Sequence, residues 1–158
     1  MKLMTGSNVE IQNYPFTTKG LMFSYLNYKD VKTIQVIDTP GLLGRENNNS
    51  IEERAEIILR EYCAQIVFVL DLTESCGYSV EQQLSLLKKT STEKVTQILY
   101  FSKVDLYNEE VKELHAELSA KYKKYKQFTY YKEIREYLIS CSLDKVEKFD
   151  PANLKVIK

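Results

Sequence analysis

Hydrophobic and polar positions are most informative in residues 34–41, where an apolar run ends in a carboxylate and a turn follows at once. Residues 34–37 have the pattern of a buried strand, and Asp38 stands at its C-terminal end. Pro40-Gly41 then directs the chain away from the sheet. Ligands of an open α/β sheet bind outside the carboxyl ends of its strands, so Asp38 is the first candidate for a metal or phosphate contact. Taken alone, the stretch is also compatible with a tight turn after a core strand.

The same patterns predict strands and helices in alternation along the chain. Apolar runs of strand length predict strands over residues 21–28, 34–38, 65–72, 95–101 and 136–142. Residues at helical spacing predict helices that begin at two capping boxes, Ser50 with Glu53 and Ser79 with Gln82, and a third over residues 111–122. The strand predicted over residues 65–72 contains a continuous apolar run at residues 66–70, as a strand buried on both faces requires. This alternation predicts an α/β fold with a mostly parallel sheet and helices on both faces.

Composition fits one compact soluble domain that spans all 158 residues, with 44% hydrophobic and 28% charged positions. The 22 basic and 22 acidic residues give no net charge, so no global basic field favours nucleic acid. The three cysteines lack the spacing of metal ligands. Cys63 and Cys141 stand beside or within apolar runs and are expected to be small buried hydrophobes in a reducing cytosol. His115 is expected to face solvent. No signal peptide and no apolar run near twenty residues occurs, so neither secretion nor membrane spanning is expected.

Two early loops offer ligands for a metal ion and a terminal phosphate. The loop at residues 15–20 carries the hydroxyls of Thr17 and Thr18, which are hard oxygen ligands suited to magnesium. Thr18 is favoured because it lies nearer the following strand. Asp38 can hold magnesium through water, and the amide of Gly41 can face a phosphate. A threonine-rich loop without a ligand explains the first stretch alone equally well.

Two later strand ends offer contacts for a guanine base. Asp105 can accept hydrogen bonds from the N1 and N2 donors of guanine, while the Lys103 stem lies along the base and its ammonium stays solvated. The backbone amides of Ser140, Cys141 and Ser142 can meet the guanine carbonyl oxygen. For any single lysine–aspartate pair, a polar strand end is the simpler interpretation. Four such stretches in this order, with helices between the strands, favour a guanine-nucleotide site.

At these residues the chain resembles P-loop GTPases. Residues 38–42 and 102–105 look like the third and fourth motifs of translation-factor-class GTPases, and residues 14–20 narrow the resemblance to the Obg-like group. Residues 71–78 with the following Glu-Gln-Gln-Leu resemble the nucleolar GTP-binding (Nog-type) branch, and this segment is the most discriminating. The motif-bearing core covers about residues 14–146.

The resemblance implies a GTPase that binds GTP or GDP with Mg²⁺ and acts in assembly of the large ribosomal subunit. Its partners would be pre-ribosomal RNA and ribosomal proteins, without a membrane, in the cytoplasm or, in a eukaryote, the nucleolus. The implied nucleotide contacts are Asp38, Thr39, Pro40, Gly41, Leu42, Ser102, Lys103, Val104, Asp105, Ser140, Cys141 and Ser142. Thr17 and Thr18 correspond to switch I, and the metal contacts are Thr18 and Asp38. No catalytic residue is assigned, because Leu42 stands where Ras-like proteins carry a catalytic glutamine, so intrinsic hydrolysis should be slow. Glu74 and Glu81 are expected to be surface charges.

The sequence departs from this family in having no Gly-x-x-x-x-Gly-Lys-Ser/Thr motif. The chain is expected to be an incomplete G domain that lacks the first strand and the P-loop, with affinity lower by several kcal/mol and no turnover. The missing strand would lie between the strands at 34–38 and 65–72, leaving ladder groups unpaired unless the two close on each other or recruit a partner. Ser102 replaces the usual asparagine, and its shorter side chain is expected to tie this loop to its neighbours less well.

Three interpretations follow from the residues. The first is a Nog-type GTP-binding domain whose missing part lies outside these residues or on a second chain. The second is a degenerate, non-enzymatic module that binds a ribosomal or protein partner. The third, an unrelated doubly wound domain such as a receiver, lacks the acidic pair that a receiver needs. The basic, tyrosine-rich stretch at residues 121–131 is either an RNA contact or a solvated helix end.

Overall fold

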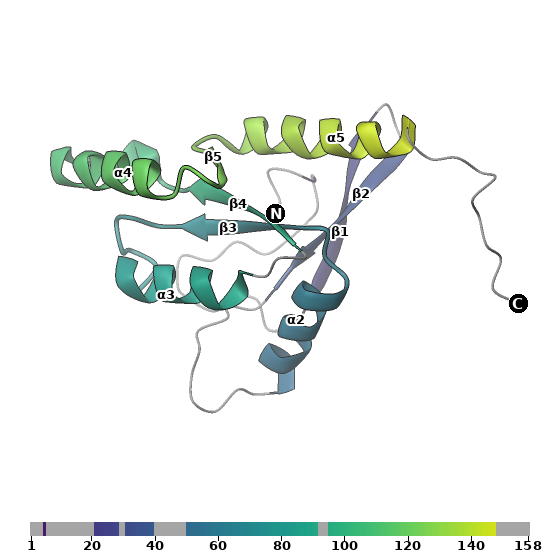
Figure 1. Ribbon diagram of the computed structural model, residues 1–158, viewed down its shortest axis with the longest axis horizontal. Coiled ribbons are helices and arrows are strands. Elements are labelled where there is room, and N and C mark those ends of the chain that lie inside the picture. The colour runs from purple at the N-terminus through teal and green to yellow at the C-terminus, as the bar shows by residue number, and fades with distance from the viewer. Residues whose placement is uncertain (1–4, 6–20, 29–30, 40–49, 92–94, 148–158) are drawn as a thin grey trace, which may run out of the picture.

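The computed structural model describes residue 5 and residues 21–28, 31–39, 50–91 and 95–147. Helices and strands alternate after an initial hairpin (Figure 1). In chain order the elements are β1 (Met22–Tyr28), β2 (Val31–Asp38), α2 (Ser50–Glu61), β3 (Gln65–Leu70), α3 (Val80–Thr90), β4 (Thr96–Phe101), η1 (Val104–Leu106), α4 (Glu109–Lys121), β5 (Lys126–Phe128) and α5 (Tyr131–Glu147). The predicted α/β class is confirmed.

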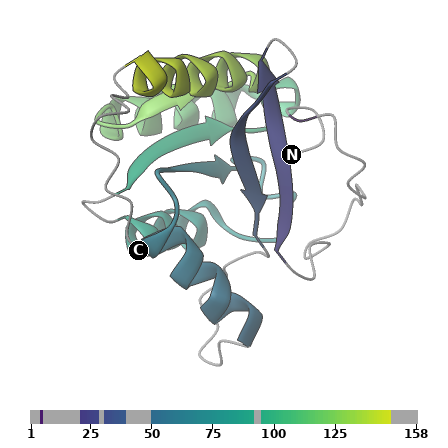
Figure 2. The same cartoon turned by 90° about the vertical axis from the view of Figure 1, so that its right-hand side faces the viewer.

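The strands form two separate sheets in the part of the chain that the structure describes. β3, β4 and β5 form a parallel sheet in which Leu70 pairs with Phe101. β1 and β2 form an antiparallel hairpin in which Met22 pairs with Asp38. The hairpin runs across the parallel sheet and does not extend it (Figure 2). No described ladder joins β2 to β3, and the break lies where the resemblance places the missing strand.

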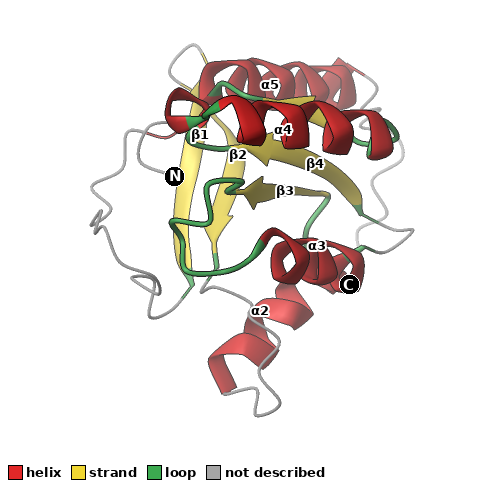
Figure 3. Cartoon of the chain, turned by 90° about the vertical axis from the view of Figure 1, so that its left-hand side faces the viewer, coloured by secondary structure: helices red, strands yellow, loops and turns green. Residues whose placement is uncertain are grey.

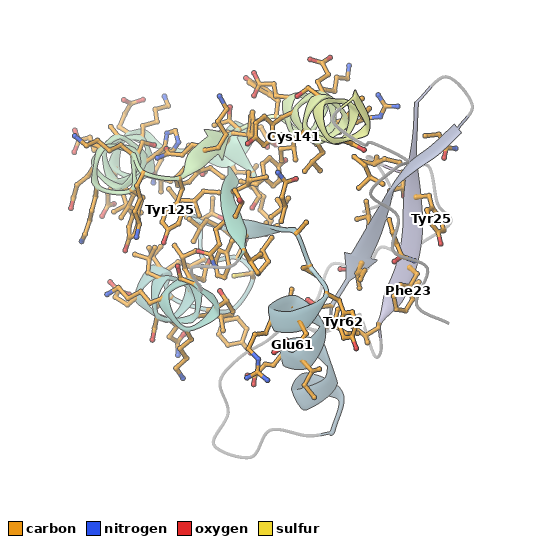
Figure 4. All side chains as sticks on the ribbon, turned by 45° about the vertical axis from the view of Figure 1, so that its right-hand side comes forward. Phe23, Tyr25, Glu61, Tyr62, Tyr125 and Cys141 are labelled. Atoms are coloured by element: carbon orange, nitrogen blue, oxygen red, sulfur yellow. The ribbon has the colours of Figure 1, made fainter. Side chains whose placement is uncertain are left out.

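Helices cover both faces of the parallel sheet, as predicted. Alternate residues of β4 supply the two cores: Leu99 and Phe101 face α3 and α4, whereas Ile98 packs with the hairpin and α5. Figure 4 shows this layering, with α3 and α4 on one side of the strands and α5 and the hairpin on the other. Leu26 of β1 is fully buried in the core that contains Ile98, and it thereby packs the hairpin against the parallel sheet. The hairpin thus closes over one face of the sheet without pairing with its edge.

β3 is less buried than its apolar sequence predicts. Val67 packs into the core shared with the hairpin, but Val69, on the same face, is 56% exposed. The expectation of a strand buried on both faces is therefore wrong at this end. Within the described sheet β3 is an edge strand, and the hairpin covers only part of its face.

The strand predicted over residues 136–142 is also wrong, because α5 runs through it from Tyr131 to Glu147. Ile134 and Leu138 are both buried and stand four residues apart, which is helical spacing. A short window hides that period and looks like a strand. No described helix is long and apolar enough to cross a bilayer.

Candidate functional site

The carboxyl ends of β3 and β4 lie side by side and carry the candidate site. Their parallel register pairs Leu70 with Phe101, so Asp71 and Ser102 leave the sheet together. The loops that follow leave at the edge where the strand arrowheads point (Figure 3). Ser102 donates to the Leu70 carbonyl from its backbone N–H (2.8 Å) and from its hydroxyl (3.0 Å). The short hydroxyl, expected to weaken the tie, thus bonds directly to the neighbouring strand end.

Asp71 is the most heavily hydrogen-bonded carboxylate described. Its side chain is buried, and one oxygen, Oδ1, accepts from the N–H (3.0 Å) and the hydroxyl (2.6 Å) of Thr73. The other, Oδ2, accepts from the Ser75 hydroxyl (3.1 Å), the Cys76 N–H (3.0 Å) and the Lys103 ammonium (2.7 Å). Burial alone would raise the pKa of Asp71, but the Lys103 and Thr73 hydrogen bonds and the Lys103 charge outweigh it and lower that pKa. The carboxylate therefore stays ionised and organises the loop around itself.

Lys103 joins this loop to the predicted base-recognition loop. Its ammonium donates to Asp71 (2.7 Å) and to the Ser75 hydroxyl (2.6 Å). The expectation of a solvated ammonium is wrong, although the side chain is still 39% exposed. The backbone of Lys103 is left-handed, with φ 56°, a conformation that costs a non-glycine residue roughly 1–2 kcal/mol. The two polar contacts offset that cost and fix where the lysine stem lies.

Asp105 lies two residues further on, in the single turn η1. Lys103 and Val104 accept the hydrogen bonds that close this turn, from Leu106 (2.9 Å) and Tyr107 (3.3 Å). Asp105 is exposed, so its carboxylate faces solvent beside the fixed lysine. The sequence motif of residues 102–105 is thus folded so that Ser102 bonds to the neighbouring strand end, Lys103 is anchored and Asp105 is exposed.

Glu74 is not the simple surface charge that the sequence predicts. Its carboxylate accepts a hydrogen bond from the N–H of Val80, the first residue of α3 (2.8 Å), and its carbonyl accepts from Gly77 (2.9 Å). Glu74 has φ 56° and Gly77 has φ 84°, so the loop needs two left-handed residues. Glu74 therefore caps α3, together with the confirmed capping box of Ser79.

Gln83 is a residue that sequence analysis missed. Its amide oxygen accepts from the Asp71 N–H (2.8 Å), and its amide nitrogen donates to the carbonyls of Asp71 (2.9 Å) and Tyr78 (3.0 Å). One side chain thus clamps both ends of the loop that follows β3. Its place in the Glu-Gln-Gln-Leu segment of the Nog-type resemblance was the available signal.

Two aromatic residues line the interior beside this loop. The Tyr107 hydroxyl is buried and has no hydrogen-bond partner among the described residues. Burial, with smaller contributions from the charges of Asp71 and Tyr100, raises the pKa of Tyr107 to about 12. His115 packs edge-on against the ring of Phe101, with 4.5 Å between centroids, so the expectation that it faces solvent is wrong. Burial lowers the pKa of His115, which favours its neutral form.

The remaining predicted contacts divide into three groups. Asp38 and Thr39 are half-buried at the end of β2, in the separate hairpin sheet. The following residues lie outside the described part of the chain: Thr17, Thr18, Pro40, Gly41 and Leu42. The residues expected after a last strand, Ser140, Cys141 and Ser142, lie inside α5. Because interior helical amides are used by the helix itself, the basis for a base contact there is lost.

No described group of three or more histidine, cysteine, aspartate or glutamate side chains is placed to hold a metal ion. Of the two residues predicted for magnesium, only Asp38 is described. A water-mediated magnesium contact needs one carboxylate and few other protein ligands, so Asp38 has the donor chemistry required. Magnesium therefore stays a prediction.

Comparison with known proteins supports the Nog-type resemblance. The family model of nucleolar GTP-binding protein 1 (NOG1) matches residues 50–105, from α2 to Asp105. The uncharacterized protein MJ1408 of Methanocaldococcus jannaschii is 41% identical over 113 residues, which are 70% of this chain and 31% of that protein. Nucleolar GTP-binding protein 1 of Encephalitozoon cuniculi is 43% identical over 88 residues (54% of this chain, 16% of that protein). The Drosophila melanogaster protein of the same name is 38% identical over 112 residues (68% and 17%).

The matched residues contain most of the candidate site that the structure describes. They include β3, the loop organised by Asp71, α3, β4 and the motif ending at Asp105. The resemblance to Nog-type GTP-binding proteins is therefore confirmed over this region. The chain spans less than a third of the length of these curated relatives.

Proposed function

We propose that this chain forms part of a guanine-nucleotide site in a Nog-type GTPase that acts in assembly of the large ribosomal subunit. One observation carries the proposal: the Asp71 loop, the most discriminating segment of the resemblance, holds Lys103 of the base-recognition motif by an ion pair of 2.7 Å. The two sequence segments that indicated this function separately thus form one structural unit. The names of the relatives support the binding of a guanine nucleotide and, in eukaryotes, a nucleolar location. In other cells the compartment would be the cytoplasm.

The geometry suits recognition of a flat base with adjacent donors. The exposed Asp105 carboxylate accepts from N1 and N2 of guanine, whereas adenine presents no such pair. The stem of Lys103 provides an apolar surface beside it, since the ammonium is held back by Asp71 and Ser75. Specificity would then depend on Asp105, and preorganisation on Lys103.

The phosphate contacts would come from a segment outside these 158 residues, on the same polypeptide or on a second chain. We propose that this segment adds a strand between β2 and β3 and brings the glycine-rich phosphate loop with it. Two observations support this: no described ladder joins the two strands, and Val69 near the end of β3 is 56% exposed. With the loop in place, Asp38 and Thr18 would hold Mg²⁺. Without it, we expect no turnover by the isolated chain.

Titration with a fluorescent GTP analogue and magnesium tests the guanine site. The unmodified chain should bind weakly, and Asp105→Ala should weaken binding at least about tenfold, the effect of losing about 1.4 kcal/mol. Glu110→Ala, an exposed carboxylate in the first turn of α4, is the matched control and should change nothing. Binding that resists Asp105→Ala would reject the assignment.

The degenerate module that binds a ribosomal or protein partner is the second candidate. The observation that favours this candidate is that β1 and β2 form a sheet separate from that of β3, β4 and β5. A site left open between the two sheets could serve a partner without any phosphate loop. Absence of binding by the isolated chain and by a chain extended upstream through any in-frame Gly-Lys-Ser/Thr motif would select this candidate. Binding that appears only in the extended chain would select the GTPase.

A further inference from the structure

Six exposed lysines gather at the edge of the parallel sheet opposite the nucleotide loops. They lie at the end of α3 and from the end of α4 to the start of β5, and we call them the lysine surface: Lys88, Lys89, Lys121, Lys123, Lys124 and Lys126. α3 leads into β4 and α4 leads into β5, so both helix ends approach the amino ends of these strands. The proposed base contacts follow the carboxyl ends. The two surfaces therefore lie at opposite edges of one sheet.

A direct contact holds the two halves of the lysine surface together. The hydroxyls of Ser91, just after α3, and Tyr125, just before β5, are 3.4 Å apart. Tyr125 also stacks on the buried Tyr122, with 6.2 Å between ring centroids. Figure 4 shows Tyr125 between α3 and α4. The lysines are thus arranged on a structured support.

None of the six lysines forms an ion pair with a carboxylate among the described residues. Residues 118–128 contain four lysines and no acidic residue. Three ammonium groups lie near aromatic rings, with the shortest distance, 4.7 Å, between Lys124 and Tyr125. In a chain of zero net charge, this concentration creates a local positive field.

Helix electrostatics explain only part of this pattern. Lys88, Lys89 and Lys121 stand in the last turns of their helices, where positive charge stabilises the helix dipole. Lys123, Lys124 and Lys126 lie beyond the helix end and gain little from that dipole, which acts within the last turn. The helix dipole therefore does not explain why Lys123, Lys124 and Lys126 are present.

We propose that the lysine surface binds the phosphate backbone of a nucleic acid. A polyphosphate chain matches several unpaired ammonium groups spread over two segments, because each can neutralise a separate phosphate. A membrane surface would also attract lysines but needs an apolar face to anchor it. In residues 84–91 and 118–132 the only large hydrophobic residue that the structure describes as exposed is Tyr130, at 64%, and a single ring is not such a face. Binding should depend on charge more than on base stacking, because Tyr122 is buried and Tyr125 is half-buried, which leaves Tyr130 as the exposed tyrosine of this stretch. This inference does not depend on the nucleotide site.

Fluorescence anisotropy with the 158-residue chain tests the proposal. The probes are a labelled 16-nucleotide uridine RNA, the matching thymidine DNA, a labelled polyglutamate peptide and phosphatidylserine vesicles. The unmodified chain should bind both nucleic acids, with a dissociation constant on the order of 10 µM at about 50 mM salt. Lys123→Gln/Lys124→Gln and Lys88→Gln/Lys89→Gln should each weaken binding at least about threefold. Each should also reduce the slope of log K against log salt by about 1.4, the value for two lost phosphate contacts on a single strand.

The matched control removes the same charge elsewhere. Lys112→Gln/Lys132→Gln changes two exposed lysines, one in the first half of α4 and one at the start of α5, and should leave affinity and slope unchanged. Circular dichroism checks that all variants are folded. A control that weakens binding as much as the two other doubles, or equal binding of polyglutamate or vesicles, overturns the proposal, as does absence of nucleic-acid binding. A preference for RNA over DNA would identify RNA as the nucleic acid that the lysine surface binds. Asp105→Ala, which should remove nucleotide binding, should leave all these results unaltered.

Discussion

The Lys103 ammonium lies 2.7 Å from Oδ2 of Asp71, and this ion pair connects the loops that follow two neighbouring strands. Asp71 is buried, whereas Lys103 is 39% exposed, so the pair sits at the boundary between the core and solvent. An anchored lysine of this kind restricts the proposed base-recognition loop before any ligand arrives. Binding then costs less ordering of the protein.

Replacing Asp71 should loosen this loop. Asp71→Asn keeps an acceptor for Thr73 but removes the charge opposite Lys103, so the free energy of unfolding should fall by about 1 kcal/mol, the figure for a charged hydrogen bond reduced for solvent screening. Nucleotide affinity, where present, should fall with it. Urea unfolding measures the first effect and fluorescent-nucleotide titration the second. Glu110→Gln serves as the control, and equal stability of Asp71→Asn and the unmodified protein would contradict a structural role for the pair.

The same pair predicts how stability depends on pH. The folded protein holds the pKa of Asp71 below its ordinary value of 3.8, because the Lys103 and Thr73 contacts outweigh burial. The ionised group therefore contributes stability above about pH 4, and this contribution is lost as the pH falls through the lowered folded value. Urea unfolding between about pH 6 and pH 3 should show a smaller acid loss in Asp71→Asn than in the unmodified protein. Glu81→Gln is the comparison variant, because it removes another carboxylate of lowered pKa at an exposed site. An acid loss unchanged in Asp71→Asn would rule out the linkage.

Much of the fold follows from local patterns that the sequence shows directly. The capping box of Ser79 and Gln82 and the apolar run of β4 are short-range signals, and the structure confirms both. The α5 region was misread because Ile134 and Leu138 must be seen together for the helical period to emerge. Burial of β3 was overestimated because exposure of Val69 depends on which strand lies beside it, and no local pattern carries that information.

The site shows the same limit. Its motif residues were found from their order along the chain, but the partners that hold them were not. Lys103 and Asp71 are 32 residues apart, and only the parallel register of β3 and β4 brings them together. The sequence analysis assigned no role to Gln83, because its hydrogen bonds depend on the path of the preceding loop.

Removing the Glu74 cap should destabilise α3. Glu74→Ala leaves the Val80 N–H without its acceptor and should lower the free energy of unfolding by about 1 kcal/mol, the usual cost of losing a helix cap. Glu74→Gln retains an acceptor oxygen and should recover most of the loss. Thermal unfolding followed by circular dichroism measures both. Equal melting temperatures for the alanine and glutamine variants would show that the contact has no energetic weight.

Paired truncations should distinguish the closed core from the open edge of the sheet. Leu99→Ala removes a fully buried side chain of β4 and should cost about 2–5 kcal/mol. Val69→Ala removes a side chain that is 56% exposed, so its cost should stay within about 0.5 kcal/mol in the isolated chain. If a further strand pairs with β3 in the complete protein, the cost of Val69→Ala should rise there, because that strand would bury the side chain. Urea unfolding of the isolated chain and of an upstream-extended chain makes the comparison. A large cost in the isolated chain would mean that the edge of β3 is already covered, and an unchanged small cost in the extended chain would contradict insertion of a strand beside it.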